Sequence, residues 1–352
     1  MAPSTRTTNK SSSKKGRQLS PEAQQDSLRS AKFWFNDGDI ILQAEGGTRY
    51  RVHQSLLSMN SAFFRDMFDT IGSSGPLEEE EMDGCALVKM QDPAKDWDTV
   101  LGTIYTPLKV HPDLEFLDVD VLLIMLRLGR KYQFDDLHEN ALHRLRKELP
   151  GDLLKFDQAF QPRLQQIFEG DRDDHCTCPK MACNPISLAK LINFALTWDV
   201  EDVLPVAYYM GLVNFTLDHI LEEVKVGGET ISLAQEAKKA LIRGQEELLP
   251  AIFGHIYPWI ARGEAYHTVP VSLCKAQDEC AKAREAIGND FLRDIQDAGR
   301  DYMVHALAKS PAIPESDDAH LGLCMLCMQH LLTHYEDARE SIFDALPDMF
   351  GL

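Results

Sequence analysis

The stretch Asp39-Ile-Ile-Leu-Gln-Ala-Glu-Gly-Gly-Thr-Arg-Tyr-Arg-Val-His53 carries the strongest structural signal in the chain. Two runs rich in apolar and β-branched residues flank the pair Gly46 and Gly47. Glycine adopts the positive φ that a tight turn requires, so the pattern predicts a β-hairpin. Tyr50 and Val52 share one face of the second strand, which predicts that this face of the hairpin is buried.

Helices and one more strand are predicted after the hairpin. Segments 53–58 and 61–68 each carry a serine near the start, Ser55 and Ser61, and a serine there is able to cap free backbone N–H groups. Ala86-Leu-Val-Lys-Met90 predicts a third strand. Apolar residues at helical spacing then predict three helices before Pro150. These residues are Trp97, Val100, Leu101 and Ile104, then Leu122, Met125, Leu126 and Gly129, then Leu137, Ala141, Leu142 and Leu145.

The first 30 residues differ in composition from the rest of the chain. Residues 1–20 carry five basic side chains and no acidic one. This Ser- and Lys-rich tail has few large apolar residues, so burial cannot offset the entropy lost on ordering, and we expect residues 1–30 to be disordered. The run Lys14-Lys-Gly-Arg17 is either a nuclear import signal or part of an ordinary solvated tail.

The net charge limits the partners of the folded part. The formal net charge is −19, and without the +5 of the tail the remainder carries −24. A body this acidic repels phosphate backbones, so we expect no contact between the folded part and nucleic acid. The sequence shows neither an apolar run long enough to span a membrane nor an apolar N-terminal secretory signal. We therefore expect a protein of the cytoplasm or the nucleus, with no membrane contact.

The N-terminal part of the sequence resembles the BTB/POZ domains of fungal proteins. The resemblance rests on Phe33-Trp-Phe-Asn-Asp-Gly-Asp39-Ile-Ile-Leu42, Tyr50-Arg-Val-His53, Leu56-Leu-Ser58 and Ser61-Ala-Phe-Phe64, and it continues through Val88-Lys-Met-Gln-Asp92 and Leu122 to Leu145. It implies a BTB/POZ domain over residues 31–149, in which a cluster of helices is flanked by a small sheet, and hence an α+β fold. Domains of this family pair with themselves and with other proteins, and they are not enzymes.

The same resemblance assigns candidate partner-binding residues. Family dimers exchange contacts through the first helix and the first strand, which points to the apolar segment Phe33-Trp34-Phe35. Many members pair an aspartate matching Asp39 with a basic residue just after the histidine matching His53. Here that position holds Gln54, so the charged pocket is incomplete. The residues themselves leave a structural alternative, in which Asp39 accepts hydrogen bonds from nearby backbone and His53 is a partly buried side chain.

Beyond Leu153 the apolar periodicity is helical and no strand is predicted. One stripe contains Leu188, Leu191, Ile192, Ala195 and Leu196, and another contains Leu331, Tyr335, Ala338 and Ile342. We therefore predict an all-α extension over residues 150–352. Its segments Gly322-Leu-Cys-Met-Leu-Cys327 and Ile342–Leu352 resemble the C-terminal extension of fungal BTB proteins, which implies a helical scaffold or a further docking face.

Four cysteines of this half suggest a metal site. The chain has eight cysteines and no export signal, which favours reduced thiols or metal binding over disulfides. Cys324 and Cys327 have the spacing that allows both thiolates to bind one Zn²⁺, and Cys274 and Cys280 would complete a tetrahedral site. The alternative is that these four are inert, packed thiols.

A second group contains His175-Cys176-Thr-Cys178 and Cys183. It is too crowded for an easy four-ligand site, and we predict a surface loop with unassigned thiols. The cysteines suggest an alternative function, a zinc- or thiol-dependent enzyme in the C-terminal half, but no Gly-rich phosphate loop, HExxH helix or GxSxG elbow supports it. The sequence favours a non-enzymatic, homodimeric adaptor or scaffold. The resemblance offers two outlets for it, a cullin-type ubiquitin ligase or transcriptional complexes.

Overall fold

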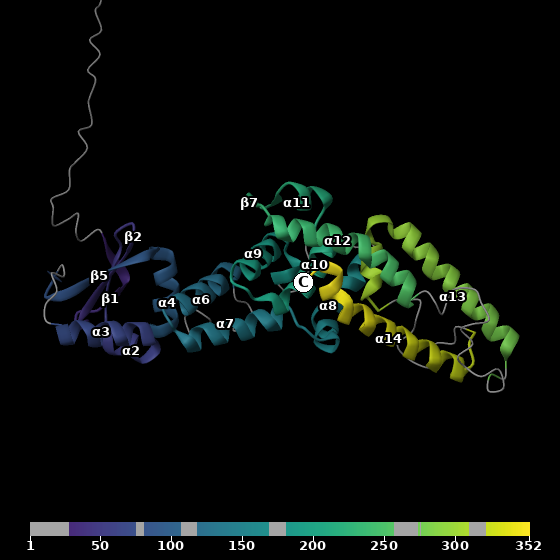
Figure 1. Cartoon of the computed structure of the whole chain (residues 1–352), viewed down its shortest axis with the longest axis horizontal. Coiled ribbons are helices and arrows are strands. Elements are labelled where there is room, and N and C mark those ends of the chain that lie inside the picture. The colour runs from purple at the N-terminus through teal and green to yellow at the C-terminus, as the bar shows by residue number, and fades with distance from the viewer. Residues whose placement is uncertain are drawn as a thin grey trace, which may run out of the picture. The chain divides into compact units, whose positions relative to one another are not determined.

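The computed structural model describes residues 28–74, 81–106, 118–168, 181–256, 274, 276–309 and 322–352. The chain divides into two compact units (Figure 1). Unit 1 consists of Met1–Pro112 and Leu128–Asp135, and unit 2 of Asp113–Arg127 and Asp136–Leu352. Unit 1 combines a sheet with helices and unit 2 is mostly helical, so the predicted α+β class is confirmed. Within the described ranges, no helix has both the length and the apolar character needed to cross a bilayer.

Unit 1 is built on a five-stranded mixed sheet. Its strands are β1 (Arg29–Trp34), β2 (Ile40–Glu45), β3 (Arg49–Val52), β4 (Glu81–Met82) and β5 (Cys85–Pro93). They lie in the order β1-β3-β2-β5-β4. Strand β2 is antiparallel to β3 and parallel to β5, whereas β1 is parallel to β3. The predicted hairpin and the predicted third strand are therefore confirmed.

The hairpin turn has the predicted glycine conformation. Gly46 and Gly47 have φ angles of 85° and 94°. Two consecutive positive φ angles give the turn whose twist matches that of the flanking strands. Tyr50 and Val52 are fully buried, as expected for one face of the hairpin.

The sequence did not predict β1 as a strand. Its residues Ala31 and Lys32 are both exposed, so the burial pattern does not alternate along the strand. The pairing of β1 with β3 shifts register between Arg29 and Trp34, which breaks the period of two. An irregular strand of this kind leaves no clear signal in the order of apolar residues.

Helices α2 (Gln54–Asn60), α3 (Ala62–Ser74) and α4 (Ala94–Tyr105) belong to unit 1. The predicted cap of the second helix is correct, because Ser61 Oγ accepts the backbone N–H of Phe64 at 3.1 Å. The predicted cap of the first helix is wrong. Ser55 lies inside α2, and the Asp39 carboxylate instead accepts the backbone N–H of Gln54 at 2.8 Å. The carboxylate that accepts the first N–H of this helix belongs to a residue 15 positions earlier in the chain, and a pattern of neighbouring residues does not predict such a contact.

Aromatic side chains form the core of unit 1. The ring of Trp97, from α4, lies 5.1 Å from that of Tyr132 and 6.1 Å from that of Phe64. Phe64 also contacts Phe134, with 5.7 Å between ring centroids. All four side chains are buried. The predicted apolar stripe of α4 therefore faces the centre of unit 1.

Unit 2 contains most of the helices. They are α6 (Val119–Lys131), α7 (Asp135–Glu148), α8 (Leu153–Phe168), α9 (Pro185–Thr197), α10 (Leu204–Asn214), α11 (Leu217–Leu221), α12 (Gln235–Ala251), α13 (Gln277–Ala298) and α14 (Met325–Phe350), although the last residues of α6 and the first of α7 belong to unit 1. The described residues also form the 3₁₀-helices η1 (Met181–Cys183), η2 (Glu201–Val203) and η6 (Gly299–Ala306) and the short π-helix η3 (Ile252–Ile256). Helix α10 buries nearly all of its side chains and packs against α9, α12 and α14. A helix that is apolar all round is central in its domain.

The predictions for the C-terminal half are mostly confirmed, with one correction. The two predicted stripes lie on α9 and α14, and their members are buried except for Leu196, which is half-buried. The prediction of no strand over 150–352 is wrong, because β6 (Val224–Val226) and β7 (Glu229–Ile231) form a hairpin. Each strand has only three residues, too few to show an alternating pattern.

Candidate functional site

Four cysteines of unit 2 lie together. Their sulfur atoms are all within 4.8 Å of one another, and they belong to Cys274, Cys280, Cys324 and Cys327. The Sγ atom of Cys274 is 3.6 Å from that of Cys327 and 3.9 Å from that of Cys324. All four are free thiols. These are the four residues that the sequence selected as zinc ligands. The structure brings them together, and metal binding itself stays a prediction.

The starts of two helices position these sulfur atoms. Cys280 lies near the start of α13, whose N-cap is Ala276. Cys324 is the N-cap residue of α14, and Cys327 lies in the first turn of that helix. Residues three apart lie on the same side of a helix, so the Cys-x-x-Cys spacing aims both side chains at one point. Cys274 reaches the cluster from the segment before α13.

Backbone groups and burial act differently on the thiols of Cys280, Cys324 and Cys327. The backbone N–H of Cys324 donates to Sγ of Cys280 at 3.2 Å. The backbone N–H of Cys327 lowers the pKa of the Cys324 thiol to about 7. Burial raises the pKa of the Cys280 and Cys327 thiols. The pKa of the partly exposed Cys324 thiol therefore lies below its ordinary value, whereas the pKa values of the Cys280 and Cys327 thiols lie above theirs.

An apolar shell surrounds the sulfur atoms. Cys274, Cys280 and Cys327 are buried. The other buried members of this cluster are Ile287, Leu323, Met328 and Leu331. The donor set is thus four soft sulfur atoms in an apolar pocket, which suits Zn²⁺ and other thiophilic metals better than Mg²⁺ or Ca²⁺.

The second cysteine group is described only at Cys183. This residue is buried within η1 together with Met181 and Ala182, so the prediction of a surface loop is wrong at that position. The η1 turn packs against α9 and α10, and this tertiary packing has no local sequence signal. His175, Cys176 and Cys178 lie outside the described residues.

The predicted partner-binding segment Phe33-Trp34-Phe35 has mixed surroundings. Phe33 is buried, with its ring centroid 6.1 Å from that of Tyr105. Trp34 is half-buried, and the guanidinium of Arg29 lies 4.6 Å from the centroid of its ring. Phe35 is half-buried and stacks on Tyr105 at 4.8 Å. Phe33 therefore belongs to the interior of unit 1, and only Trp34 and Phe35 offer surface to a partner.

Asp39 and His53 make local contacts within unit 1. Asp39 accepts the backbone N–H of Gln54, as the structural alternative predicted, and the Gln54 amide donates to the Asp39 carbonyl at 3.2 Å. His53 is partly buried, with Nδ1 3.1 Å from the Tyr105 hydroxyl and Nε2 3.4 Å from an Asp37 carboxylate oxygen. The His53 backbone N–H also donates to that hydroxyl at 3.0 Å. These contacts stabilise the connection between the end of β3 and the start of α2.

Two features on the described surface of unit 1 are of a kind that occurs at protein contacts. Strand β1 lies at one end of the sheet, and an edge strand presents backbone N–H and C=O groups to another chain. Ala31 and Lys32 of this strand are exposed. The second surface lies on α2 and α3, where Met59 is 73% exposed and Phe63 is 37% exposed.

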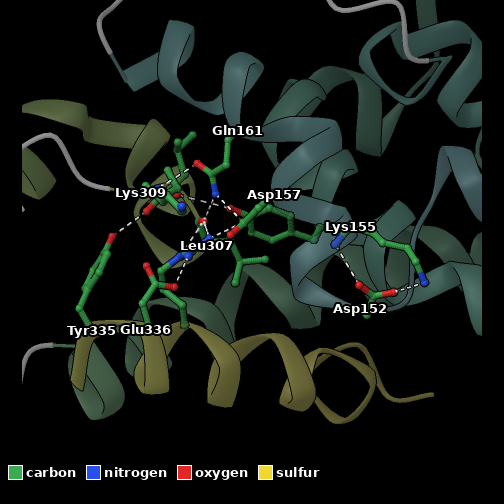
Figure 2. Close-up of polar contacts among 12 residues, drawn as sticks. Asp152, Lys155, Asp157, Gln161, Leu307, Lys309, Tyr335 and Glu336 are labelled. Carbon is green, nitrogen blue, oxygen red and sulfur yellow. Dashed lines mark hydrogen bonds and ion pairs between the residues drawn. The ribbon is translucent and has the colours of Figure 1, made fainter. Parts of the chain in front are cut away.

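A buried charged group of unit 2 was not singled out from the sequence. Arg339 of α14 has a side chain that is 0% exposed. Its Nη2 atom donates to Asp157 Oδ1 at 2.5 Å and to the Leu307 carbonyl at 2.8 Å, and its Nη1 atom donates to Glu336 at 2.6 Å. Figure 2 shows Asp157, Gln161, Leu307 and Glu336 close together. We call these five residues the Arg339 clasp.

The Arg339 clasp joins three segments of unit 2. Gln161 of α8 donates to Asp157 at 2.7 Å and to the Leu307 carbonyl at 2.9 Å, and accepts the Lys309 backbone N–H at 2.9 Å. The clasp thus ties α8, residues 307–309 and α14 together. Its sequence signal is the position of Arg339, a charged residue four after Tyr335 on the buried stripe of α14.

The comparison with protein families agrees with the resemblance in the sequence. Residues 29–149 match the BTB/POZ domain. The match does not distinguish fungal members from others. A search of curated proteins finds no match to this chain.

Proposed function

We propose that this chain, with a BTB/POZ domain at its N-terminal side, is a homodimeric adaptor or scaffold. The observation that carries the proposal is the BTB/POZ match over residues 29–149, because this domain is a protein–protein interaction module. The proposal takes residues 31–149 as the pairing domain and residues 150–352 as a helical extension that supports it or adds a docking face. We also propose that the protein acts in the cytoplasm or the nucleus.

The exposed edge of β1 is the proposed contact between two copies. Another strand is able to extend the sheet there through backbone hydrogen bonds. The half-buried rings of Trp34 and Phe35 lie in and just after this strand and would lose further exposed area in a dimer. Asp39 directly precedes β2, which β3 separates from β1, and its carboxylate accepts the Gln54 N–H, so we propose that it supports this contact only by holding the start of α2.

The dimer is tested by light scattering coupled to size-exclusion chromatography. The wild-type chain of 39.7 kDa should elute with about twice that mass at micromolar concentration. Ala31→Asp places a charge on the exposed edge and should yield monomers, because a desolvated carboxylate opposes strand addition. Gln91→Asp is the matched control, an exposed position on the inner strand β5. A monomeric wild type, or an unchanged Ala31→Asp dimer, would contradict the proposed contact.

The exposed pair Met59 and Phe63 is the proposed face for a different protein. Large apolar side chains exposed on a pair of contacting helices are typical of protein interaction sites. The two outlets suggested by the family are a cullin-type ubiquitin ligase and a transcriptional complex, and we propose that this face serves one of them.

Proximity labelling in the native host separates the two outlets. The wild type is compared with a Met59→Glu, Phe63→Glu double variant, and with Leu154→Glu as a control at another side chain that is 70% exposed. Ligase subunits labelled by the wild type and the control but lost in the double variant support the ligase outlet. Transcription factors with the same behaviour support the other outlet. Identical labelling by all three proteins contradicts a role for the α2–α3 face.

A further inference from the structure

We propose that Cys274, Cys280, Cys324 and Cys327 bind a single zinc ion in a closed, structural site that joins the starts of α13 and α14. The proposal is independent of the dimer and of the partner face on unit 1. It rests on the distances between sulfur atoms, on the backbone groups around them and on the small size of the apolar cluster that they share.

The distances suit one tetrahedral ion. A Zn–S bond is about 2.3 Å long, which sets the separation of two sulfur ligands at about 3.8 Å in a tetrahedron. The separations of 3.6 Å and 3.9 Å from Cys274 Sγ to the sulfur atoms of Cys327 and Cys324 lie on either side of this value, and all the others are within 4.8 Å. A disulfide needs sulfur atoms about 2.05 Å apart, and a cluster of several iron atoms needs a wider cage.

The surrounding backbone suits the charge of the complex. When zinc binds, each thiol releases its proton to solvent, and four thiolates around one Zn²⁺ leave a net charge of −2. The backbone N–H of Cys324 already donates to Cys280 Sγ at 3.2 Å. Cys280 lies near the start of α13, and Cys324 and Cys327 at the start of α14, where the free N–H groups of each helix stabilise negative charge. Arg284, one turn beyond Cys280, adds a positive charge near the site.

Packing alone is a weak explanation for this cluster. Besides the cysteines, its buried members are Ile287, Leu323, Met328 and Leu331. Four apolar side chains bury little surface area, yet the two helix starts that they join are far apart in sequence, with a separation of 44 residues between Cys280 and Cys324. Apolar cores this small usually need a covalent or metal cross-link for stability. A metal bound by both segments would supply that link, because its binding energy contributes directly to folding.

The site would be structural rather than catalytic. A catalytic zinc keeps one position for water or substrate, whereas four protein ligands leave none. Three of the four sulfur atoms belong to buried side chains, and only Cys324 is partly exposed. The site would therefore hold the two helix starts in place and take no part in a reaction.

Metal analysis of the full-length chain tests the proposal. Protein purified without chelator is expected to contain one zinc ion per chain by elemental mass spectrometry. X-ray absorption at the zinc edge should show four sulfur neighbours at about 2.3 Å. Replacing the zinc with Co²⁺ should give the intense visible and near-ultraviolet bands of tetrahedral cobalt thiolates.

Cysteine variants assign the ligands. Cys327→Ser and Cys280→Ser should each lose most of the bound zinc. Cys183→Ser is the matched control, because Cys183 is also a buried cysteine of unit 2 but is not a member of the four-cysteine cluster. It should retain the full zinc content. The absorption measurement on the wild type keeps the test valid if a ligand variant fails to fold.

Several results would overturn the proposal. A wild type without zinc, with iron in place of zinc, or with a disulfide between two of the four cysteines would show that no zinc site exists. Zinc retained in both ligand variants, or a zinc ion with nitrogen or oxygen neighbours, would show that the metal binds elsewhere. Catalytic turnover that depends on the bound zinc would overturn the structural role.

Discussion

Different kinds of contact stabilise the cores of unit 1 and unit 2. The interior of unit 1 is a set of packed aromatic rings centred on Trp97 and Phe64. Unit 2 adds directional contacts to its apolar core, in the Arg339 clasp and in the cysteine cluster at the starts of α13 and α14. Aromatic packing tolerates the loss of a polar atom but not of volume, whereas a buried ion pair tolerates the loss of both partners better than of one. The stability of unit 1 should therefore be most sensitive to substitutions that reduce side-chain volume, and that of unit 2 to substitutions that remove one partner of a buried ion pair.

The largest effect is expected in unit 1 from Trp97→Ala. The variant leaves a cavity among rings that are fully or nearly fully buried, and large-to-small changes of this type cost about 3–5 kcal/mol. Chemical denaturation followed by Tyr and Trp fluorescence measures the loss for the unit 1 transition. The transition of unit 2 should remain, because this core is built from unit 1 residues.

The conservative variant Trp97→Phe sharpens this result. The indole Nε1 is buried and has no hydrogen-bond partner among the described residues, so removing it relieves an unsatisfied donor. We expect Trp97→Phe to cost much less than the alanine variant, about 1 kcal/mol for the smaller ring. Equal losses for the two variants would show that the indole N–H has a partner and that polar contacts matter in unit 1 as well.

The next largest effect is expected in unit 2 from Arg339→Leu. The variant leaves the Asp157 carboxylate without its guanidinium partner, with a side chain that is only 16% exposed. Breaking a buried pair in this way costs about 3 kcal/mol. Glu336→Gln is the control, because its side chain is 51% exposed and its ion pair should contribute less than about 1 kcal/mol.

A double variant distinguishes the ion pair from simple packing. Arg339→Leu combined with Asp157→Leu removes both charges, so it should be more stable than Arg339→Leu alone. Calorimetry of the wild type, the single variants Arg339→Leu and Asp157→Leu, and the double variant gives the coupling energy of the pair. If the losses of the two single variants simply add, the clasp acts by volume, and the contrast between the two units disappears.

A smaller effect is expected where α12 meets α14. A Cβ atom added at Gly244 would lie 2.1 Å from the Phe350 ring, so Gly244→Ala must displace that ring. Overpacking of this kind costs about 2 kcal/mol. Gly254→Ala is the matched control in the turn after α12, since nothing lies within 4 Å of the added atom. Thermal unfolding should separate the two variants, and equal melting temperatures would show that the ends of α12 and α14 repack freely.

The contrast between the units also explains which features the sequence could predict. The hairpin of unit 1 depends on neighbouring residues, because Gly46 and Gly47 set the turn and alternation sets the buried face. The helices of unit 2 show their buried stripes at a spacing of three and four residues. Both signals are local, and both predictions are confirmed.

Features made by distant residues were missed or left open. The cap of α2 comes from Asp39 and the partners of Arg339 from α8 and residues 307–309, and neither contact has a local pattern. The cysteine set was an intermediate case. The Cys324-x-x-Cys327 spacing pointed to a shared ligand position, but only the fold shows that Cys274 and Cys280 lie within reach.

The smallest effect is expected at the N-terminus. Removing residues 1–25 should change the free energy of unfolding by less than about 0.5 kcal/mol, because this Ser- and Lys-rich sequence has few large apolar side chains to bury. Removing residues 1–34 is the informative control. That deletion also removes β1, which pairs with β3 and carries the buried ring of Phe33, so it should cost at least about 2 kcal/mol. Thermal unfolding of the two truncated chains measures both losses. A drop of many degrees for the shorter deletion would mean that the tail docks on the folded part.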